Sequence, residues 1–466
     1  FGLEQQDAGE IIYGNQKVKI NSPQQAMRLG IGMVHQHFMQ VPSLTVAENV
    51  VLGQEPRRGL KLDLSAARQL VREVSTRYGL AVDPDAKVRD LPVGIQQRVE
   101  IIKALSQGAE LLILDEPTAV LTPQETEELF QVLKNMARQD KTIIFISHKL
   151  KEVLTISDSI TIMRAGQVVA NLETASTSEE EIARLMVGRP VLLQVDKKEA
   201  QIGEPVLEVK DLWVANHQGL PALQGVSFTL HSGEILGIAG VQGNGQTELV
   251  EALSGLIRVE HGEIIKQGQS LKGLTVEKIR RAGVAHIPED RFRRGLCGSA
   301  TVLENMIAGQ QYEGSPFVHR GIVNWEKAAE YTKKAIDQYD IKVGSIYDLA
   351  ASLSGGNAQK VVVAREFSTN ADVLLVSQPT RGVDIGAIEF IHKCLVAKRD
   401  AGCAILLVSA DLQEILSLSD RLLVLYQGQL TAELDPGQTS EEELGLYMSG
   451  ARRMNVREKA VGAGAY

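Results

Sequence analysis

The chain has 466 residues, of which 44% are hydrophobic and 23% charged, a composition that is ordinary for a globular protein of two or three domains. No apolar run approaches the ~18 residues that a membrane-spanning helix needs. The formal net charge of −9 argues against a nucleic-acid-binding protein, and the 3 cysteines, without the spacing of a metal site, suit a reducing cytosol.

Apolar runs of strand length alternate along the chain with longer amphipathic segments. This alternation predicts an α/β fold, in which a mainly parallel sheet is covered by helices. The apolar runs are 111–114, 142–146, 160–163, 235–239, 373–376, 404–408 and 422–425. The amphipathic segments are 65–78, 126–138, 276–281 and 325–339.

A polar stretch bracketed by Pro190 and Pro205 predicts a short linker between two domains. The end of the chain is rich in Ala, Gly and Arg, and we expect it to be poorly ordered. The predicted organisation is a first domain (1–189), a linker (190–205), a second domain (206–449) and a tail (450–466).

The two domains repeat one series of motifs in the same order, with small insertions in the second copy. The first copy reads GEII, GIGMVHQ, TVAENV, LPVGIQQRV, DEPT and SH, beginning at Gly9, Gly30, Thr45, Leu91, Asp115 and Ser147. The second reads GEII, GVAHIPE, TVLENM, LSGGNAQKV, SQPT and SA, beginning at Gly262, Gly283, Thr301, Leu353, Ser377 and Ser409. Each candidate residue therefore has a counterpart with which its chemistry can be compared.

A glycine loop, GVQGNGQT, is visible in the second copy. Its glycines let backbone N–H groups cradle a phosphate, but a glutamine stands where a lysine would supply positive charge. The loop residues concerned are Gly240, Gly243, Asn244, Gly245, Gln246 and Thr247. Extending the repeat backwards places the counterpart of this loop upstream of residue 1. We therefore expect an amino-terminally truncated first domain that lacks its first strands and its phosphate loop.

Several motifs together carry a resemblance to a known family: an apolar strand ending in Asp-Glu before PT, an LSGG segment ahead of it, a glutamine loop, and a strand ending in Ser-His. They resemble the ATP-binding-cassette (ABC) ATPases, in two tandem copies, as in the ATPase subunits of bacterial simple-sugar and nucleoside importers. The resemblance covers nearly the whole chain. It implies two P-loop NTPase domains, each with a parallel sheet and a helical subdomain, in which one copy's LSGG segment completes the nucleotide site of the other.

One composite site keeps the residues that this resemblance implies for ATP hydrolysis. Asp115 would hold Mg²⁺, Glu116 would act as the general base, and His148 would hold the γ-phosphate and the attacking water. Gln36, in the glutamine loop, belongs to the same catalytic and metal-binding set. The other copy would contribute Ser354, Gly355, Gly356, Asn357 and Asp384. The alternatives are a solvated turn at Asp115 and Glu116 and a structural role for His148.

The other composite site departs from the family pattern at nearly every position. Gln378 stands in place of the base, and because a glutamine cannot accept a proton from water as a carboxylate can, we expect no hydrolysis there. The other departures are Gln246, Glu289, Ser377 and Ala410 in the second copy and Pro92, Val93 and Thr122 in the first. Retention of nucleotide through the loop backbone alone stays open, as does stacking of Trp213 or His217 on adenine.

The stretches around GMVHQHFMQ, LPVGIQQRV and HIPEDRFRRGL are similar to the nucleoside-importer branch of the family. We therefore expect an ATPase subunit, with ATP and Mg²⁺ as cofactors, that energises nucleoside import. The implied partners are two transmembrane permease subunits and, indirectly, an extracytoplasmic solute-binding protein, with no nucleic acid. The implied location is the cytoplasmic face of the cell membrane.

Three alternatives to this function are kept. The first is a simple-sugar importer of the ribose or galactose type, and the second is a soluble tandem ATPase acting on ribosomes. The short linker and the asymmetric sites speak against the ribosomal class. The third is a non-catalytic scaffold, because the chain as printed, without a first glycine loop, is expected to be inactive alone.

Overall fold

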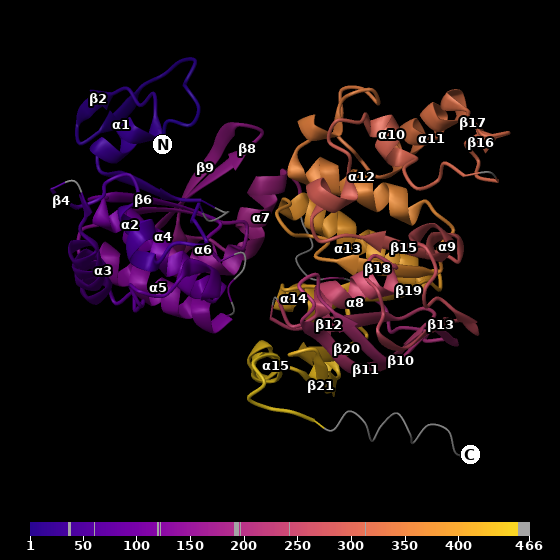
Figure 1. The fold of residues 1–466 in the computed structure, drawn as a ribbon. Helices are drawn as coiled ribbons and strands as arrows, with labels where there is room; N and C mark the ends of the chain where they lie inside the picture. The colour runs from indigo at the N-terminus through magenta and orange to yellow at the C-terminus, as the bar shows by residue number, and fades with distance from the viewer. Residues whose placement is uncertain are drawn as a thin grey trace. The chain divides into compact units, whose positions relative to one another are not determined.

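The computed structural model describes residues 1–35, 39–59, 61–118, 121, 123–190, 195, 197–241, 243–312 and 314–454, without the side chains of Val93 and Pro123. The chain divides into two compact units, which we call unit 1 (Phe1–Gly188) and unit 2 (Arg189–Tyr466). Figure 1 shows the elements of both units, coloured along the chain.

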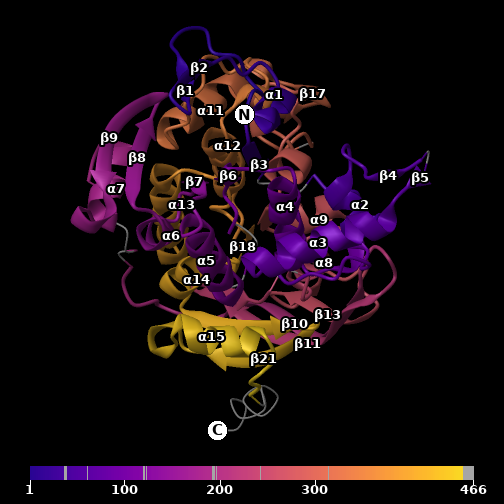
Figure 2. The same ribbon diagram turned by 90° about the vertical axis from the view of Figure 1, so that its left-hand side faces the viewer.

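Unit 1 contains a three-stranded parallel sheet in the order β3-β6-β7. Val34 pairs with Leu114 and Asp115 pairs with Ile146, so the carboxyl ends of the three strands lie at one edge of the sheet. The helices α2, α3 and α4 pack on one another, as Figure 2 shows. The strands are β1 (Ile11–Tyr13), β2 (Gln16–Val18), β3 (Ile31–Val34), β4 (Arg57–Arg58), β5 (Lys61–Leu62), β6 (Leu111–Asp115), β7 (Thr142–Ile146), β8 (Ser159–Arg164) and β9 (Gln167–Glu173). The helices are α1 (Pro23–Arg28), α2 (Val46–Val51), α3 (Leu64–Tyr78), α4 (Val93–Ser106), α5 (Pro123–Ala137), α6 (Leu150–Ile156) and α7 (Glu179–Val187).

The sequence sets the ends of these helices. α2 begins with a capping box, in which Thr45 accepts from the backbone N–H of Glu48 while the Glu48 carboxylate accepts from that of Thr45. Asp63 caps the beginning of α3, because its carboxylate accepts from two backbone N–H groups, and Gly79 caps the end of α3 with a φ of 73° that glycine readily adopts. These caps fix the ends of α2 and α3, which pack on α4.

Unit 2 contains two larger sheets. The six-stranded sheet has the order β15-β18-β19-β12-β20-β21 and is parallel except at β21, and the four-stranded antiparallel sheet has the order β11-β10-β13-β14. The strands are β10 (Pro205–Ala215), β11 (Pro221–His231), β12 (Ile235–Ala239), β13 (His261–Lys266), β14 (Gln269–Ser270), β15 (Val284–Ile287), β16 (Val318–His319), β17 (Ile322–Val323), β18 (Val373–Ser377), β19 (Ala404–Val408), β20 (Arg421–Tyr426) and β21 (Gln429–Leu434). The helices are α8 (Gln246–Leu253), α9 (Val276–Arg281), α10 (Val302–Met306), α11 (Trp325–Gln338), α12 (Gly355–Phe367), α13 (Ile385–Asp400), α14 (Leu412–Leu418) and α15 (Glu441–Met448).

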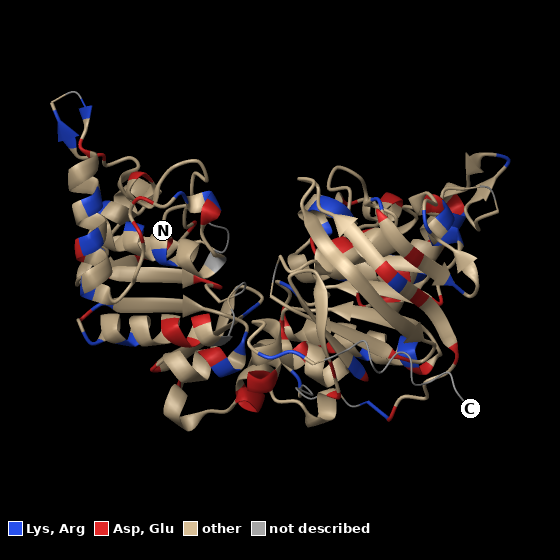
Figure 3. Ribbon diagram, turned by 60° about the horizontal axis from the view of Figure 1, so that its bottom comes forward, with Lys and Arg blue, Asp and Glu red and all other residues tan. Residues whose placement is uncertain are grey.

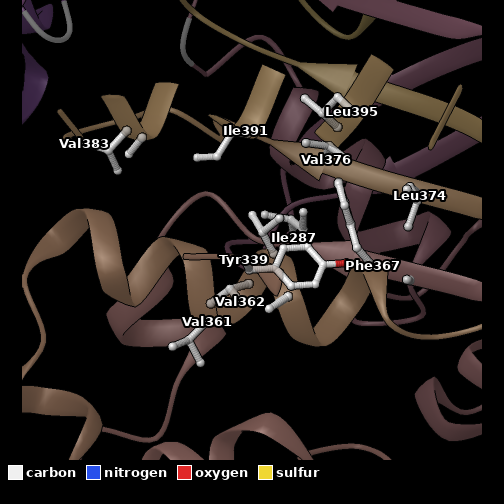
Figure 4. Packing of buried hydrophobic residues seen from close by; sticks show 14 of the residues in the cluster. Ile287, Tyr339, Val361, Val362, Phe367, Leu374, Val376, Val383, Ile391 and Leu395 are labelled. Carbon is white, nitrogen blue, oxygen red and sulfur yellow. The ribbon is translucent and has the colours of Figure 1, made fainter. Parts of the chain in front are cut away.

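The main core of unit 2 packs α12 and α13 against the six-stranded sheet. Figure 4 shows Val361 and Val362 of α12 near Ile287 of β15, with Val376 of β18 and Ile391 of α13 in the same cluster. All five side chains are at most 1% exposed. The burial of this layer holds the beginnings of α12 and α13 at fixed places beside the sheet.

The predicted linker is tied to unit 2 in its described part. Lys197 donates through Nζ to the carbonyl of Leu418, at 3.0 Å, and Arg399 donates to the carbonyl of Lys198, at 2.9 Å. The backbone N–H of Gly203 donates to the carbonyl of Ser232. Of the predicted tail, residues 455–466 lie outside the described part of the chain.

The seven predicted apolar runs all lie in strands, and the four predicted amphipathic segments coincide with α3, α5, α9 and α11 within a few residues. The α/β fold class is confirmed. The four-stranded antiparallel sheet was not predicted. Among the described residues, no helix combines the length and apolar character needed to cross a bilayer. Charges of both signs are interspersed over the described residues on the face shown in Figure 3.

Candidate functional site

Three of the four residues predicted for catalysis and metal binding in unit 1 come together at the carboxyl end of the parallel sheet. Asp115 is the last residue of β6, Glu116 follows it, and His148 lies just beyond β7. The Nδ1 atom of His148 is 2.7 Å from Oε1 of Glu116, and the two side chains are 21% and 19% exposed. Gln36, the fourth residue, lies outside the described residues.

The backbone at Glu116 is unusual. Its φ is 46°, a left-handed value that non-glycine residues rarely adopt. Its N–H donates to the carbonyl of Ile146 at 2.9 Å, which locks the turn to the end of β7. Such a conformation persists only where the surroundings over-determine it, and here it aims the carboxylate at His148.

A network of polar side chains from α4 and α6 contacts the residues that follow this turn. Gln97 of α4 donates to the carbonyl of Pro117, and Thr118 donates to the carboxylate of Glu152. Glu152 also pairs with Lys149 at 3.2 Å. The sequence analysis did not select Gln97, Lys149 or Glu152. A signal was present for two of them, because Gln97 and Glu152 recur in the second copy as Gln359 and Glu414.

The donor set at Asp115 fits one kind of metal ion. Among the described residues, no group of three or more His, Cys, Asp and Glu side chains could form a metal cage. Mg²⁺ usually keeps several waters and binds to one or two carboxylates together with substrate phosphates. A single carboxylate at the end of a strand suits that mode of binding.

Unit 2 repeats the backbone of this site without its charges. Gln378 follows β18 with a φ of 48°, and its N–H donates to the carbonyl of Val408 at 2.7 Å. Its Oε1 accepts from the N–H of Ala410 at 3.1 Å, where unit 1 has His148. Ser377, at the place of Asp115, is 6% exposed. The turn is therefore conserved within the chain while the carboxylates and the imidazole are replaced.

The glycine loop of unit 2 joins β12 to α8. Gly243 and Gly245 have φ values of 91° and 108°, which only glycine adopts without strain. Gln246 begins α8, and its Nε2 donates to the loop carbonyl of Val241 at 3.1 Å. The side chain of Gln246 is therefore hydrogen-bonded to the loop itself, and Gln246 is only 7% exposed.

The other residues of this loop are held in different ways. Asn244 accepts from the N–H of Gln427 at 2.9 Å, which anchors the loop to the turn between β20 and β21. A side chain at Gly240 would collide with the carboxamide of Gln246. Thr247 is exposed. Backbone N–H groups at the beginning of α8 can bind an anion, but no lysine side chain accompanies them in this loop.

The predicted LSGG residues gather at the beginning of α12. Ser354 caps the helix, because its hydroxyl oxygen accepts from the backbone N–H of Asn357 at 3.4 Å and from its side chain at 2.9 Å. A side chain at Gly356 would lie 2.9 Å from the Asp384 carboxylate, and one at Gly355 would meet Arg291. These five predicted residues of unit 2 are therefore adjacent to one another.

The same helix in unit 1 begins differently. Pro92 is the N-cap of α4 and makes no side-chain cap hydrogen bond. The side chain of Val93 and the whole of Thr122 lie outside the described residues. In unit 2, Glu289 forms an ion pair with Arg381, while Arg291 donates to the carbonyls of Arg381 and Gly382 at 2.6 and 3.0 Å. The sequence analysis missed both arginines.

Comparison with known proteins adds an independent line of evidence. The family model described as ABC transporter matches residues 1–119 and 223–381. A guanosine import ATP-binding protein, NupO of Bacillus subtilis, is 46% identical over 97% of this chain and 88% of its own length. A nucleoside import ATP-binding protein, NupA of Lactococcus lactis, is 45% identical over 98% of this chain and 90% of its own. A ribose import ATP-binding protein, RbsA 1 of Rubrobacter xylanophilus, is 37% identical over 97% of this chain and 89% of its own length.

Proposed function

This chain belongs to the ABC transporter family, and we propose that it is an ATP-hydrolysing subunit that energises the import of nucleosides, with hydrolysis carried out at Glu116 of unit 1. One observation carries the proposal. The same turn occurs in both units, with φ values of 46° and 48°, but it presents Glu116 beside His148 in unit 1 and Gln378 beside Ala410 in unit 2.

In unit 1 each residue has a chemical task. Glu116 accepts the proton of the attacking water, because an ionised carboxylate with a positioned partner is a competent general base. His148 orients that carboxylate through the 2.7 Å contact and would hold the γ-phosphate and the attacking water. Asp115 would hold Mg²⁺, which neutralises charge on the phosphate oxygens when it is bound. Gln36 belongs to the same set on the strength of the sequence resemblance.

In unit 2 the residues support binding without turnover. The loop that ends at Gln246 can hold phosphates through backbone N–H groups at the beginning of α8. Gln246 adds no charge, and its amide is used within the loop. Ser377 and Gln378 supply neither the carboxylate that would hold Mg²⁺ nor a base. We propose that unit 2 retains nucleotide for longer than unit 1 and does not hydrolyse it.

The transported solute is proposed from the relatives. Two relatives named for guanosine or nucleoside import are 46% and 45% identical to this chain, whereas the ribose relative is 37% identical. Nucleosides are therefore preferred. Simple sugars are the second candidate, because a glucose import ATP-binding protein of Haloferax volcanii, TsgD13, is 41% identical. The partners are two transmembrane permease subunits and, through them, a solute-binding protein, and the place is the cytoplasmic face of the membrane.

An uptake experiment tests this function. The full-length protein is reconstituted in proteoliposomes with its permease subunits and solute-binding protein, and ATP-dependent uptake of labelled guanosine and labelled ribose is measured. We expect uptake of guanosine that stops in the Glu116→Gln variant. Uptake of ribose but not guanosine would replace the nucleoside proposal with the sugar alternative, and guanosine uptake that survives Glu116→Gln would refute the role of Glu116.

A further inference from the structure

Two short segments carry the proposed catalytic residues of unit 1. Segment 116–118 follows β6 and begins with Glu116, and segment 147–149 follows β7 and has His148 at its centre. Glu152, in the first turn of α6, directs one carboxylate to both segments. The two catalytic residues therefore lie on segments that a third side chain connects.

The connection is made by several polar contacts. The hydroxyl of Thr118 donates to Oε2 of Glu152, and the hydroxyl of Ser147 donates to the same oxygen at 3.4 Å. The Nζ atom of Lys149 lies 3.2 Å from Oε1 of Glu152 and donates to the carbonyl of Thr118 at 3.3 Å. Thr118 is 1% exposed and the Glu152 side chain is 13% exposed, so these contacts are largely shielded from water, which strengthens them. We call Thr118, Lys149 and Glu152 the bridge.

The same positions in unit 2 do not form a bridge. They are Thr380, Asp411 and Glu414 in the repeat. Oε1 of Glu414 contacts Nε2 of His392 at 2.9 Å, and its Oε2 makes no hydrogen bond to any described residue. Unit 1 has Phe130 at the position of His392, and a phenyl ring offers a carboxylate no N–H group. Among the described residues, this glutamate connects the two segments in the unit with the proposed catalytic pair and not in the other.

The lysine of the bridge occupies a helix-capping position. Lys149 is the N-cap of α6, and its side chain makes no cap hydrogen bond. Asp411, at the same position in unit 2, accepts from the backbone N–H of Glu414 at 3.0 Å and caps α14. Aspartate is among the preferred N-cap residues, because its side chain satisfies an N–H group of the first turn. Unit 1 therefore lacks a stabilising cap at this helix, and the cation in its place contacts the bridge.

We propose that Lys149 and Glu152 are positioning residues for ATP hydrolysis, and that the bridge holds the two segments at the separation that keeps His148 against Glu116. The N–H of Glu116 makes a backbone hydrogen bond to the carbonyl of Ile146, and the bridge joins the two segments beyond that point. A misplacement of about 1 Å can cost roughly 10²-fold in rate, so loss of the bridge should lower turnover. This inference rests on the hydrolytic role proposed for Glu116, through which the bridge acts.

The Lys149→Asp variant separates positioning from a structural role. It gives α6 the cap that Asp411 gives α14, so the melting temperature should not fall. The bridge loses its cation, and kcat for phosphate release by the full-length protein with its permease subunits should fall at least ~10-fold, with a smaller change in KM for ATP. An unchanged kcat in Lys149→Asp would overturn the proposal.

A double-mutant cycle tests the bridge as a unit, and it decides the matter if Lys149→Asp is less stable than the unsubstituted protein. Thr118→Val keeps the shape of the side chain and removes its hydroxyl, and Glu152→Ala removes the carboxylate. Each should lower kcat about 10-fold or more, because a hydrogen bond to a charged group is lost. The double variant should be no slower than Glu152→Ala, because residues of one network are not additive. Losses that multiply in the double variant would contradict the bridge.

Two controls are matched to these variants. Thr380→Val makes the same change in unit 2, and Val153→Ala removes buried methyl groups from α6. Both should keep kcat close to that of the unsubstituted protein. A loss of kcat in Val153→Ala as large as that in Glu152→Ala would assign the effect to the stability of α6 and overturn the proposal.

Glu116→Gln, measured in the same assay, distinguishes this inference from the function on which it rests. Turnover that is lost in Glu116→Gln but kept in Glu152→Ala would overturn the bridge alone. Turnover that is kept in Glu116→Gln would refute the hydrolytic role of Glu116, and the positioning role with it. We expect kcat to fall in both variants while ATP still binds.

Discussion

The Glu116→Gln substitution separates the chemistry of the catalytic turn from its geometry. Unit 2 shows that a glutamine takes the same left-handed backbone, with a φ of 48° against 46°, and that its side chain still finds a partner, at 3.1 Å in place of 2.7 Å. The variant should therefore fold and bind ATP as the unsubstituted protein does. What it loses is the proton acceptor, because a carboxamide is not a base.

The expected magnitude follows from that single loss. General-base catalysis contributes about 10²–10⁴-fold, so kcat for phosphate release should fall by that factor. This corresponds to roughly 3–5 kcal/mol of transition-state stabilisation. The assay is steady-state phosphate release by the full-length protein with its permease subunits, together with an ATP-binding measurement. The matched control is Gln378→Glu in unit 2, which should leave kcat unchanged because Ser377 and Ala410 remain. A Glu116→Gln variant that keeps more than about a tenth of its turnover would refute the general-base role.

Three further outcomes are expected. Gln246→Lys should tighten nucleotide binding to unit 2, because it adds the missing positive charge at the beginning of α8. Titration of a fluorescent ATP analogue into the Glu116→Gln background checks this, and unchanged affinity would contradict it. Ser354→Ala should destabilise α12 by about 1 kcal/mol through loss of its N-cap, measured as the change in the free energy of unfolding from denaturant titration. The control is Ser352→Ala, two residues earlier in the chain, in a position that does not cap α12. Burial, aided by Arg280 and Arg365 and opposed by Glu366, lowers the pKa of His286 from 6.5 to about 4, so the folded state binds fewer protons than the unfolded one between these values. The contribution of this residue to the free energy of unfolding is therefore complete above pH 6.5 and is lost as the pH falls toward 4, by up to roughly 3 kcal/mol. His286→Asn should flatten the dependence of the free energy of unfolding on pH in this range. A slope of free energy against pH equal to that of the unsubstituted protein would exclude His286 as its source.

The order of motifs predicted that Asp115, Glu116 and His148 lie close together, for a simple physical reason. Asp115 and His148 each follow an apolar strand, and the carboxyl ends of neighbouring parallel strands meet at one edge of a sheet. The sequence could therefore place both residues, with Glu116, at one site. The distance between the Glu116 and His148 side chains and the left-handed backbone of Glu116 depend on the hydrogen bond from the N–H of Glu116 to the carbonyl of Ile146. No sequence pattern indicates this hydrogen bond.

Other elements were missed because their signal is weak. α12 has residues buried on all sides, so it shows no apolar stripe against a polar face. β10 and β11 bury alternate residues rather than a continuous run, so a search for apolar runs passes over them. Gln246 was predicted as a neutral substitute for lysine, but its bond to the carbonyl of Val241 depends on the path of the loop.

The restriction of hydrolysis to unit 1 is tested most directly by counting trapped nucleotide. The full-length protein with its permease subunits is incubated with Mg²⁺, ATP and orthovanadate, and the ADP retained per chain is measured after gel filtration. We predict one retained ADP per chain in the unsubstituted protein and in Gln378→Glu, and none in Glu116→Gln. Two retained ADP molecules per chain in the unsubstituted protein, or retention of ADP by Glu116→Gln, would contradict hydrolysis by unit 1 alone.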